Sequence, residues 1–440
     1  MRPSSTTSRL AGVLAASVLV LSACSDDGGE ETTAAATDET SATESAPEEE
    51  ETSAAPEKPS GAKGDGTLTV GTLLPQTGDL AFLGPPEFAG VDVAIEEINA
   101  AGGVLGKPVK TIRGDSGDGT PNVAPGNTRD LIDGGSDVIV GAASSSVSLS
   151  VIDAIVNAGV VHFSPANTST AFDTYDDKGL YFRTAPSDVL QGAVMANMLA
   201  EDGHDNVAIL ARQDSYGEAL ADQVEKVFTD NGGNITDKIL YDANASTFGA
   251  EVGKVAASQP DAVVLIAFSE TIKIIPEMIK NNIGPDDLQI YFVDGNTADY
   301  SGDFDKGTLD GIKATYPGAE LTSDFRDRML KVDKKLTEFT YGPESYDATM
   351  LSALAAVAAK DDSGESIASQ LQAVSTGGTA CTAFKECADL LEQGEDIDYN
   401  GVSGDIEFND TGSPSSATIG IFQYGPDNTY SNLSYVDGQI

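Results

Sequence analysis

Apolar and polar positions alternate in blocks between residues 67 and 293, and each block has the length of a strand or a helix. Short apolar runs bounded by turn residues predict buried strands. Apolar positions three and four residues apart predict helices, as at Phe88, Val91, Ile95 and Ile98. The predicted strands are 67–74, 108–113, 137–140, 160–163, 206–210, 235–240, 262–267 and 290–293, and the predicted helices between them are 87–100, 123–132, 147–157, 189–200, 217–228, 251–257 and 272–280.

The strict alternation of strand and helix predicts parallel sheets with helices on both faces. The pattern changes near residues 180–186 and then starts again, which indicates two such units. We therefore predict an α/β fold with two doubly wound, Rossmann-like lobes. A further helix is expected over residues 346–359, and strand-like segments from Tyr399 onward indicate that the chain crosses back.

The first 24 residues have the pattern of a secretory signal. Arg2 and Arg9 precede an apolar run from Leu10 to Leu21, which is shorter than the roughly 20 residues of a membrane span. The following Leu-Ser-Ala-Cys sequence resembles the lipobox of bacterial lipoproteins, in which the cysteine receives a diacylglycerol. We predict that residues 1–23 are removed and that Cys24 is lipidated; the alternative is a plain secreted protein with a chance cysteine.

Residues 25–65 have the composition of a solvated tether. They contain no aromatic residue and no Ile, Leu, Val or Met, and they are rich in Glu, Ser, Thr and Ala. Such a segment cannot bury enough apolar area to offset the loss of conformational entropy on ordering. We therefore expect a disordered acidic tether over residues 24–65, with the folded protein outside the cytoplasmic membrane.

Charge and cysteine content narrow the classes of function. The chain has 25 Lys and Arg against 70 Asp and Glu, a formal charge of −45, so nucleic acid is a poor partner. The roughly 375 residues beyond the tether suit two domains. Cys381 and Cys387 are expected to form a disulfide, because close cysteine pairs in exported proteins are usually oxidised; two free thiols are the alternative, and a metal site is not expected.

The sequence lacks the motifs that usually bring chemistry to an α/β fold. The turn after the first predicted strand is Leu-Pro-Gln-Thr-Gly-Asp, without a dinucleotide fingerprint. The only histidines are His162 and His204, and neither lies near a Gly-x-Ser-x-Gly elbow. We therefore predict no cofactor and no enzymatic activity, and we keep an exported hydrolase that uses His162 as a remote alternative.

Several motifs stand along the chain in a recognisable order. The longest stretch is 71–107, which ends in Ile-Asn-Ala-Ala-Gly-Gly-Val-Leu-Gly-Lys. The others are Ser-Pro-Ala-Asn-Thr at 164–168, Phe182-Arg183 with Asp188, Ser-Tyr-Gly at 215–217, Tyr-Asp-Ala at 346–348 and Tyr-Asn-Gly-Val-Ser-Gly at 399–404. In order and at fitting intervals, these motifs resemble those of the extracytoplasmic solute-binding proteins of ABC transporters, specifically the branched-chain amino-acid group. The match covers most of residues 67–425.

The resemblance implies a type I periplasmic binding protein fold, in which three hinge strands join two lobes that close on a small solute. It places the hinges near residues 184–187, 314–318 and 400–404. The first lobe would then comprise residues 66–185 and 317–399, and the second lobe residues 186–316 and 400–440.

A carboxylate site is expected where the strand at 137–140 ends, because ligands bind beyond the carboxyl ends of strands in open α/β sheets. Gly-Ala-Ala-Ser-Ser-Ser follows that strand and opens a helix, whose backbone N–H groups suit an anion. Ser144 and Ser145 are the candidates, although a role in capping the helix is equally compatible for Ser144. The resemblance gives the ligand's α-carboxylate to Ser145 and further contacts to Ala166, through its backbone, and to Thr168. Asn167, which lies between them in the same turn, is a further candidate.

The second lobe is expected to cover the ligand. The resemblance implies that Tyr216 packs on the solute and that an acid at or near Asp294 pairs with its ammonium group, while Glu270 remains a rival. A buried ammonium group needs such a partner, because an unpaired buried charge is costly. The expected selectivity wall is Phe82, Leu83 and Phe268; Leu83 departs from the resemblance, since members often have an aromatic residue there.

The resulting prediction is a lipid-anchored receptor on the outer face of the cell membrane. It would capture a small amino acid, of the branched-chain type, and deliver it to ABC permease subunits as a monomer, without nucleic acid or cofactor. Two alternatives stay open: a ligand sensor of the same fold that feeds a signalling partner, and a receptor for urea or a short amide.

Overall fold

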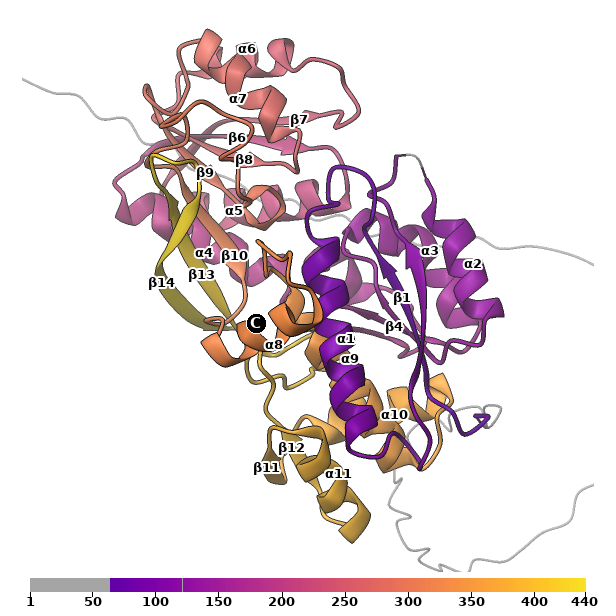
Figure 1. Cartoon of the computed structure of the whole chain (residues 1–440). Helices are drawn as coiled ribbons and strands as arrows, with labels where there is room; N and C mark the ends of the chain where they lie inside the picture. The colour runs from indigo at the N-terminus through magenta and orange to yellow at the C-terminus, as the bar shows by residue number, and fades with distance from the viewer. Residues whose placement is uncertain (1–63, 121) are drawn as a thin grey trace, which may run out of the picture. The chain divides into compact units, whose positions relative to one another are not determined.

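The computed structural model describes residues 64–120 and 122–440 (Figure 1). The predicted signal peptide, the lipidated Cys24 and all but the last two residues of the tether lie outside the described residues. The described residues belong to one compact unit. Among them, no helix combines the length and the apolar character that crossing a membrane requires.

The first sheet has five parallel strands in the order β2-β1-β3-β4-β5. β1, β3 and β4 are buried along their whole length, as expected for a parallel sheet that is covered on both faces. The strands are β1 (Thr69–Leu74), β2 (Lys110–Asp115), β3 (Val138–Gly141), β4 (Val161–Ser164) and β5 (Tyr181–Arg183).

Alternate residues of the first sheet face two different layers of helices. Val70 and Val138 pack with α1 (Gly84–Ala100) and α9 (Gly342–Ala359), which lie side by side in Figure 1. Leu73 and Ile139 point to the other face and pack with α2 (Ala124–Asp133) and α3 (Ser145–Asn157). The period-two pattern of each strand therefore produces two cores on one sheet.

The second sheet has seven strands in the order β14-β13-β10-β9-β8-β6-β7. β6 to β10 are parallel to one another, whereas β13 and β14 add an antiparallel edge. The strands are β6 (Asn206–Arg212), β7 (Asn234–Tyr241), β8 (Ala262–Ile266), β9 (Gln289–Phe292), β10 (Lys313–Pro317), β13 (Ser416–Tyr424) and β14 (Tyr430–Gln439).

Helices also cover both faces of the second sheet. α4 (Asp188–Glu201) and α5 (Ser215–Asp230) pack on the face that Ile209 and Val264 present. α6 (Gly249–Ser258) and α7 (Thr271–Lys280) pack on the opposite face. The α/β class with two doubly wound lobes is therefore confirmed.

The chain between 318 and 399 returns to the first sheet and is more helical than the sequence analysis predicted. Only the helix now seen as α9 was expected there. α8 (Ser323–Val332) packs on α1, and α10 (Gly364–Val374), α11 (Phe384–Gln393) and the short strands β11 (Thr379–Cys381) and β12 (Ile397–Tyr399) complete this part. A disulfide joins Cys381 at the end of β11 to Cys387 in α11.

Three segments connect the elements of the two sheets. Residues 184–187 lead from β5 to α4, residues 318–322 lead from β10 to α8, and residues 400–415 lead from β12 to β13. The second follows the predicted hinge at 314–318, because residues 314–317 belong to β10. The third differs from the predicted hinge at 400–404, because Ile406 and Phe408 still pack in the core of the first sheet. That crossing therefore comes after Phe408, while the residue limits of the two lobes stay a prediction.

The buried carboxylate of Asp347 fixes the beginning of this third connection. It accepts hydrogen bonds from the Tyr399 hydroxyl (2.7 Å), from the backbone N–H groups of Val402 (3.1 Å) and Ser403 (2.7 Å), and from the Ser403 hydroxyl (2.6 Å). A side chain at Gly401 would collide with this carboxylate. Hydrogen bonds thus join the Tyr-Asp-Ala motif at 346–348 to the Tyr-Asn-Gly-Val-Ser-Gly motif at 399–404, although Asp347 and Tyr399 are 52 residues apart.

We expect Asp347→Ala to lower the free energy of unfolding by about 2–4 kcal/mol, because it leaves buried donors without an acceptor. Denaturant unfolding measures the change. The matched control is Asp389→Ala, which removes a carboxylate that pairs with Lys385 on the surface of α11. That substitution is expected to cost about 0.5 kcal/mol or less, and equal losses in the two variants would contradict the role given to Asp347.

Candidate functional site

A small cavity lies where the carboxyl ends of strands from both sheets meet. This is the position that open α/β sheets use for ligands. Residues after β1, β3 and β4 line it from the first sheet, and residues after β6, β8 and β9 line it from the second. The lining residues are Leu80, Leu83, Ala143, Ser144, Ser145, Ala166, Tyr216, Phe268, Asp294, Gly295 and Tyr341.

The start of α3 forms one polar wall of this cavity. Gly141 ends β3 with a φ of +123°, and any side chain there would collide with the Leu73 carbonyl. The chain then turns at the N-cap residue Ser144, whose side chain does not cap the helix. Its hydroxyl lies 3.0 Å from that of Ser146 instead. The first N–H groups of α3 therefore face the cavity without a side-chain cap, which favours an anion.

The turn after β4 combines a lining residue with two supporting residues. Ala166 lines the cavity. The Asn167 amide donates to the carbonyls of Ala142 (3.0 Å) and Ala143 (2.8 Å), so it ties this turn to the one before α3. Thr168 is buried, its carbonyl accepts from the Asp188 N–H at 2.7 Å, and its hydroxyl has no hydrogen-bond partner among the described residues. Asn167 and Thr168 do not line the cavity.

The opposite polar wall is the carboxylate of Asp294 in the short helix η2 (Asp294–Asn296). It accepts hydrogen bonds from the hydroxyl groups of Tyr216 (2.6 Å) and Tyr341 (2.8 Å) and from the Gln191 amide (3.1 Å). All three donors are neutral. Burial raises the pKa of the Asp294 carboxyl, and the hydrogen bonds only partly offset this effect.

Asp188 is a second buried acid beside this wall, and the sequence analysis did not select it as a site residue. It is the first residue of α4, directly after the first connection between the sheets. Neither of its carboxylate oxygens has a hydrogen-bond partner among the described residues. Burial and, secondly, the charge of Asp294 hold the pKa of the Asp188 carboxyl well above its usual range, and the neighbouring Thr168 hydroxyl, which lowers this pKa, only partly offsets them. Its place in a Pro-Ser-Asp turn between a strand and a helix was the available signal.

Glu270, the rival of Asp294, is occupied elsewhere. Its carboxylate accepts from the Arg212 guanidinium at 3.0 Å and from the Tyr241 hydroxyl at 2.9 Å. The same guanidinium lies 3.3 Å above the centre of the Phe268 ring. Glu270 thus binds Arg212, which packs on Phe268 in the cavity wall, whereas Asp294 itself lines the cavity.

Leu80, Leu83, Phe268 and the ring of Tyr341 form the apolar part of the lining. The rings of Phe268 and Tyr216 stack with their centres 5.5 Å apart. Phe82 does not line the cavity and packs against the two cores of the second sheet instead. Leu80 and Tyr341 were missed by the sequence analysis; Tyr341 stands just before α9, which begins at Gly342 rather than at the predicted residue 346.

His162 takes no part in this site. It is fully buried in β4, its ring packs edge-on against Tyr181 with a centre-to-centre distance of 5.3 Å, and burial lowers its pKa to about 3. The described residues contain no cluster of three or more potential metal ligands.

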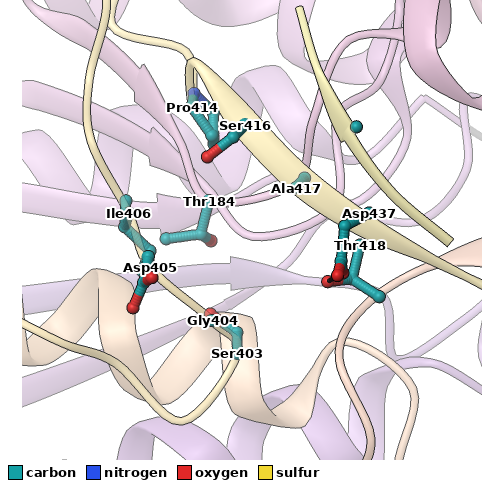
Figure 2. A pocket seen from close by; sticks show the side chains of 11 residues that line it. Thr184, Ser403, Gly404, Asp405, Ile406, Pro414, Ser416, Ala417, Thr418 and Asp437 are labelled. Carbon is teal, nitrogen blue, oxygen red and sulfur yellow. Dashed lines mark hydrogen bonds between the residues drawn. The ribbon is translucent and has the colours of Figure 1, made fainter. Parts of the chain in front are cut away.

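A second hollow lies at the connections between the sheets (Figure 2). Thr184 lines it from the first connection, and residues from 403 to 414 line it from the third. Its charged side chains are Asp405 and Asp437, and Asp437 accepts a hydrogen bond from Thr418 at 2.7 Å. Strands β13 and β14 form the rest of its wall, so rearrangement of the crossing segments against these strands would change its width.

The fold and the cavity between two α/β lobes define a solute-binding protein of the type I periplasmic class. The family profile described as periplasmic binding protein matches residues 67–398, and the chain belongs to this family. The family and the fold are those of periplasmic substrate-binding proteins.

Three relatives illustrate the similarity. The chain is 28% identical to the chemotactic signal transduction system substrate-binding protein BasB of Halobacterium salinarum over 77% of this chain and 83% of the relative. It is 26% identical to Leu/Ile/Val-binding protein homolog 2 of Brucella abortus, over 82% and 92%. The crystal structure of LivJ from Streptococcus pneumoniae with isoleucine superimposes with a TM-score of 0.69 at 20% identity, over 85% of this chain and all of that one.

Proposed function

We propose that this protein is the lipid-anchored receptor of an ABC importer, and that it captures a small amino acid between its two lobes. The observation that carries the proposal is that one wall of the cavity favours an anion and another wall favours a cation. The uncapped start of α3 faces it from the first sheet, and the buried Asp294 faces it from the second. A zwitterion has the two charges that these walls would complement.

The proposed binding mode assigns the α-carboxylate of the ligand to Ser145 and the N-terminus of α3. The ammonium group goes to Asp294, with Asp188, Thr168 and the Ala166 carbonyl nearby. Asp188 and Thr168 supply buried polar atoms that have no other partner among the described residues. Buried polar groups are normally hydrogen-bonded, so these atoms favour a cationic donor in the ligand.

The proposed side-chain preference is for the branched-chain type, because Leu80, Leu83 and Phe268 offer apolar contacts. The names of the Brucella and Streptococcus relatives point to the same class. Urea and short amides are the alternative ligands. They carry no positive charge, so they would leave the two buried acids uncompensated, and the geometry favours an amino acid over them.

In the proposed transport cycle the ligand shifts the population of conformers towards the closed one by contacting both lobes. The closed protein would then dock as a monomer on membrane permease subunits, while the lipid on Cys24 keeps it at the outer face of the membrane. The lobes are those predicted from the sequence, with the third crossing moved beyond Phe408.

A sensor that feeds a signalling partner is the second candidate function. The specific observation in its favour is the similarity to BasB, whose name places that relative in a chemotactic signal transduction system. Both functions use the same cavity. Genes for permease and ATPase subunits beside this one would support transport, and genes for signalling proteins would support sensing.

Calorimetric titration tests the proposal. The purified protein is unfolded, refolded to remove bound solute and titrated with the common amino acids, urea, short amides and benzoate, an anion without an amine. Tight binding of aliphatic amino acids without any product is the expected result. Binding of benzoate or urea in preference to amino acids would contradict the assignment of Asp294 to an ammonium group.

A further inference from the structure

We propose that Glu338, which lies outside the cavity, is a positioning residue that latches the two lobes together around the bound solute. It sits in the segment 333–341 that joins α8 to α9. The inference rests on the proposed capture of a solute in the cavity. It adds a residue that controls affinity and residence time without touching the ligand.

The segment that carries Glu338 is anchored in the first lobe. Of the residues on either side of it, Leu336 belongs to the core of the first sheet and the partly buried Phe339 packs against that core. The Arg326 guanidinium in α8 lies 4.9 Å above the centre of the Phe339 ring. The segment is therefore held by the lobe that contains α1, α8 and α9.

The carboxylate of Glu338 makes both of its hydrogen bonds to the second lobe. One oxygen accepts from the backbone N–H of Asp299 at 2.9 Å, and the other accepts from the Tyr430 hydroxyl at 2.7 Å. Asp299 closely follows η2, which carries Asp294, and Tyr430 begins the edge strand β14. The Tyr430 ring packs edge-on against Phe422 of β13, so it is a fixed partner.

The same segment also reaches the ligand cavity. Tyr341 stands three residues after Glu338, and its hydroxyl donates to Asp294 at 2.8 Å. One short segment of the first lobe thus contacts the second lobe at two places, through Tyr341 at the cavity and through Glu338 at the edge strand β14. Separation of the lobes would break both contacts, so the free energy of the Glu338 contact adds to the closed state and hence to the apparent affinity.

The surroundings of Glu338 indicate that its role is to accept hydrogen bonds rather than to neutralise a cation. Its charge interacts with titratable groups that are acids or phenols rather than cations, namely Asp299, Tyr316, Tyr424 and Tyr430. Burial in this contact raises the pKa of the Glu338 carboxyl. A neutral glutamine could keep both contacts, because its carbonyl accepts from Asp299 and a tyrosine hydroxyl both donates and accepts.

Two variants, Glu338→Ala and Glu338→Gln, test the latch in the full-length protein. Hydrogen–deuterium exchange of the Asp299 amide reports the contact directly, and stopped-flow measurement of L-leucine dissociation reports its effect on the closed state. We expect Glu338→Ala to speed exchange at Asp299 and to raise the dissociation rate roughly tenfold. Glu338→Gln should stay within about threefold of the wild type in both measurements.

Tyr430→Phe provides the partner control, because it removes one donor and keeps the ring. A double-mutant cycle with Glu338→Ala should show coupling, since the two residues share one contact. Unchanged exchange at Asp299 in Glu338→Ala, or an equal defect in Glu338→Gln, would overturn the latch. Failure of L-leucine to bind the wild-type protein would refute the proposed ligand, and the exchange at Asp299 would still decide the latch.

Discussion

Asp294→Asn is expected to weaken the binding of a small aliphatic amino acid by about a hundredfold or more. The substitution keeps the size of the side chain and an acceptor for one of the two tyrosine hydroxyl groups, which donate to different oxygens, and its amide can donate to the other hydroxyl; it removes the charge opposite the proposed ammonium site. Breaking a buried charge pair at a binding site typically costs about 2–5 kcal/mol, and about 1.4 kcal/mol corresponds to a factor of ten. Calorimetric titration measures the loss.

The same substitution should leave the fold intact. Burial raises the pKa of Asp294, so the ionised carboxylate is a cost to the folded protein rather than a source of stability. We expect the free energy of unfolding to change by no more than about 1 kcal/mol. A large loss of affinity without a loss of stability is typical of a group retained for binding.

Glu270→Gln is the matched control, because Glu270 was the rival acid. It leaves the buried Arg212 without one of its two carboxylate partners, so we expect lower stability and at most a threefold change in affinity, roughly the effect of a minor contact. The reverse pattern, with affinity lost in Glu270→Gln and kept in Asp294→Asn, would transfer the ammonium site to Glu270.

The elements around the site could be predicted from the sequence because local patterns encode them. The apolar run at 262–267 and the run at 137–140 became β8 and β3, and Phe268 after the first and Ser144 and Ser145 after the second line the cavity. Strand ends are fixed by where the apolar run stops, and the carboxyl ends of parallel strands share one edge. Ser144, Ser145 and Asp294 follow from these rules and the family resemblance.

The remaining features depend on contacts that no local pattern encodes. Arg212, which is distant in sequence from both acids, pairs with Glu270 and leaves Asp294 as the acid that lines the cavity. Tyr341 lines the cavity because α9 begins at Gly342, although Pro343 in the first turn was the available signal for an earlier start. The third crossing lies beyond Phe408, rather than at the predicted residues 400–404, because the Phe408 ring packs against Phe163 and Phe182.

Asp188→Asn is expected to raise the free energy of unfolding at pH 8 and to lower the affinity for amino acids roughly tenfold. Its raised pKa means that the folded protein binds a proton more tightly than the unfolded chain. Stability from this group is therefore present below the unfolded pKa and is lost as the pH rises through the folded pKa. An asparagine carries no ionisable proton, so the variant should lose less stability between pH 5 and pH 8 than the wild type.

Glu87→Gln separates the two effects of Asp188. Glu87 is also a buried carboxyl without a hydrogen-bond partner among the described residues, and burial and the charge of Glu344 raise its pKa well above the usual range. It packs in α1, away from the cavity lining. Both variants should therefore flatten the dependence of stability on pH, as measured by denaturant unfolding at pH 5 and pH 8.

Only Asp188→Asn should also change ligand binding. A ligand ammonium group stabilises the ionised form of the acids beside it, so ligand binding releases protons and wild-type affinity rises with pH until the ligand amine itself deprotonates. Titration across this range should show a shallower rise in Asp188→Asn and an unchanged rise in Glu87→Gln. Wild-type affinity that falls with increasing pH would contradict an ammonium group at Asp188 and Asp294, and the cavity would then have to hold a ligand without a positive charge.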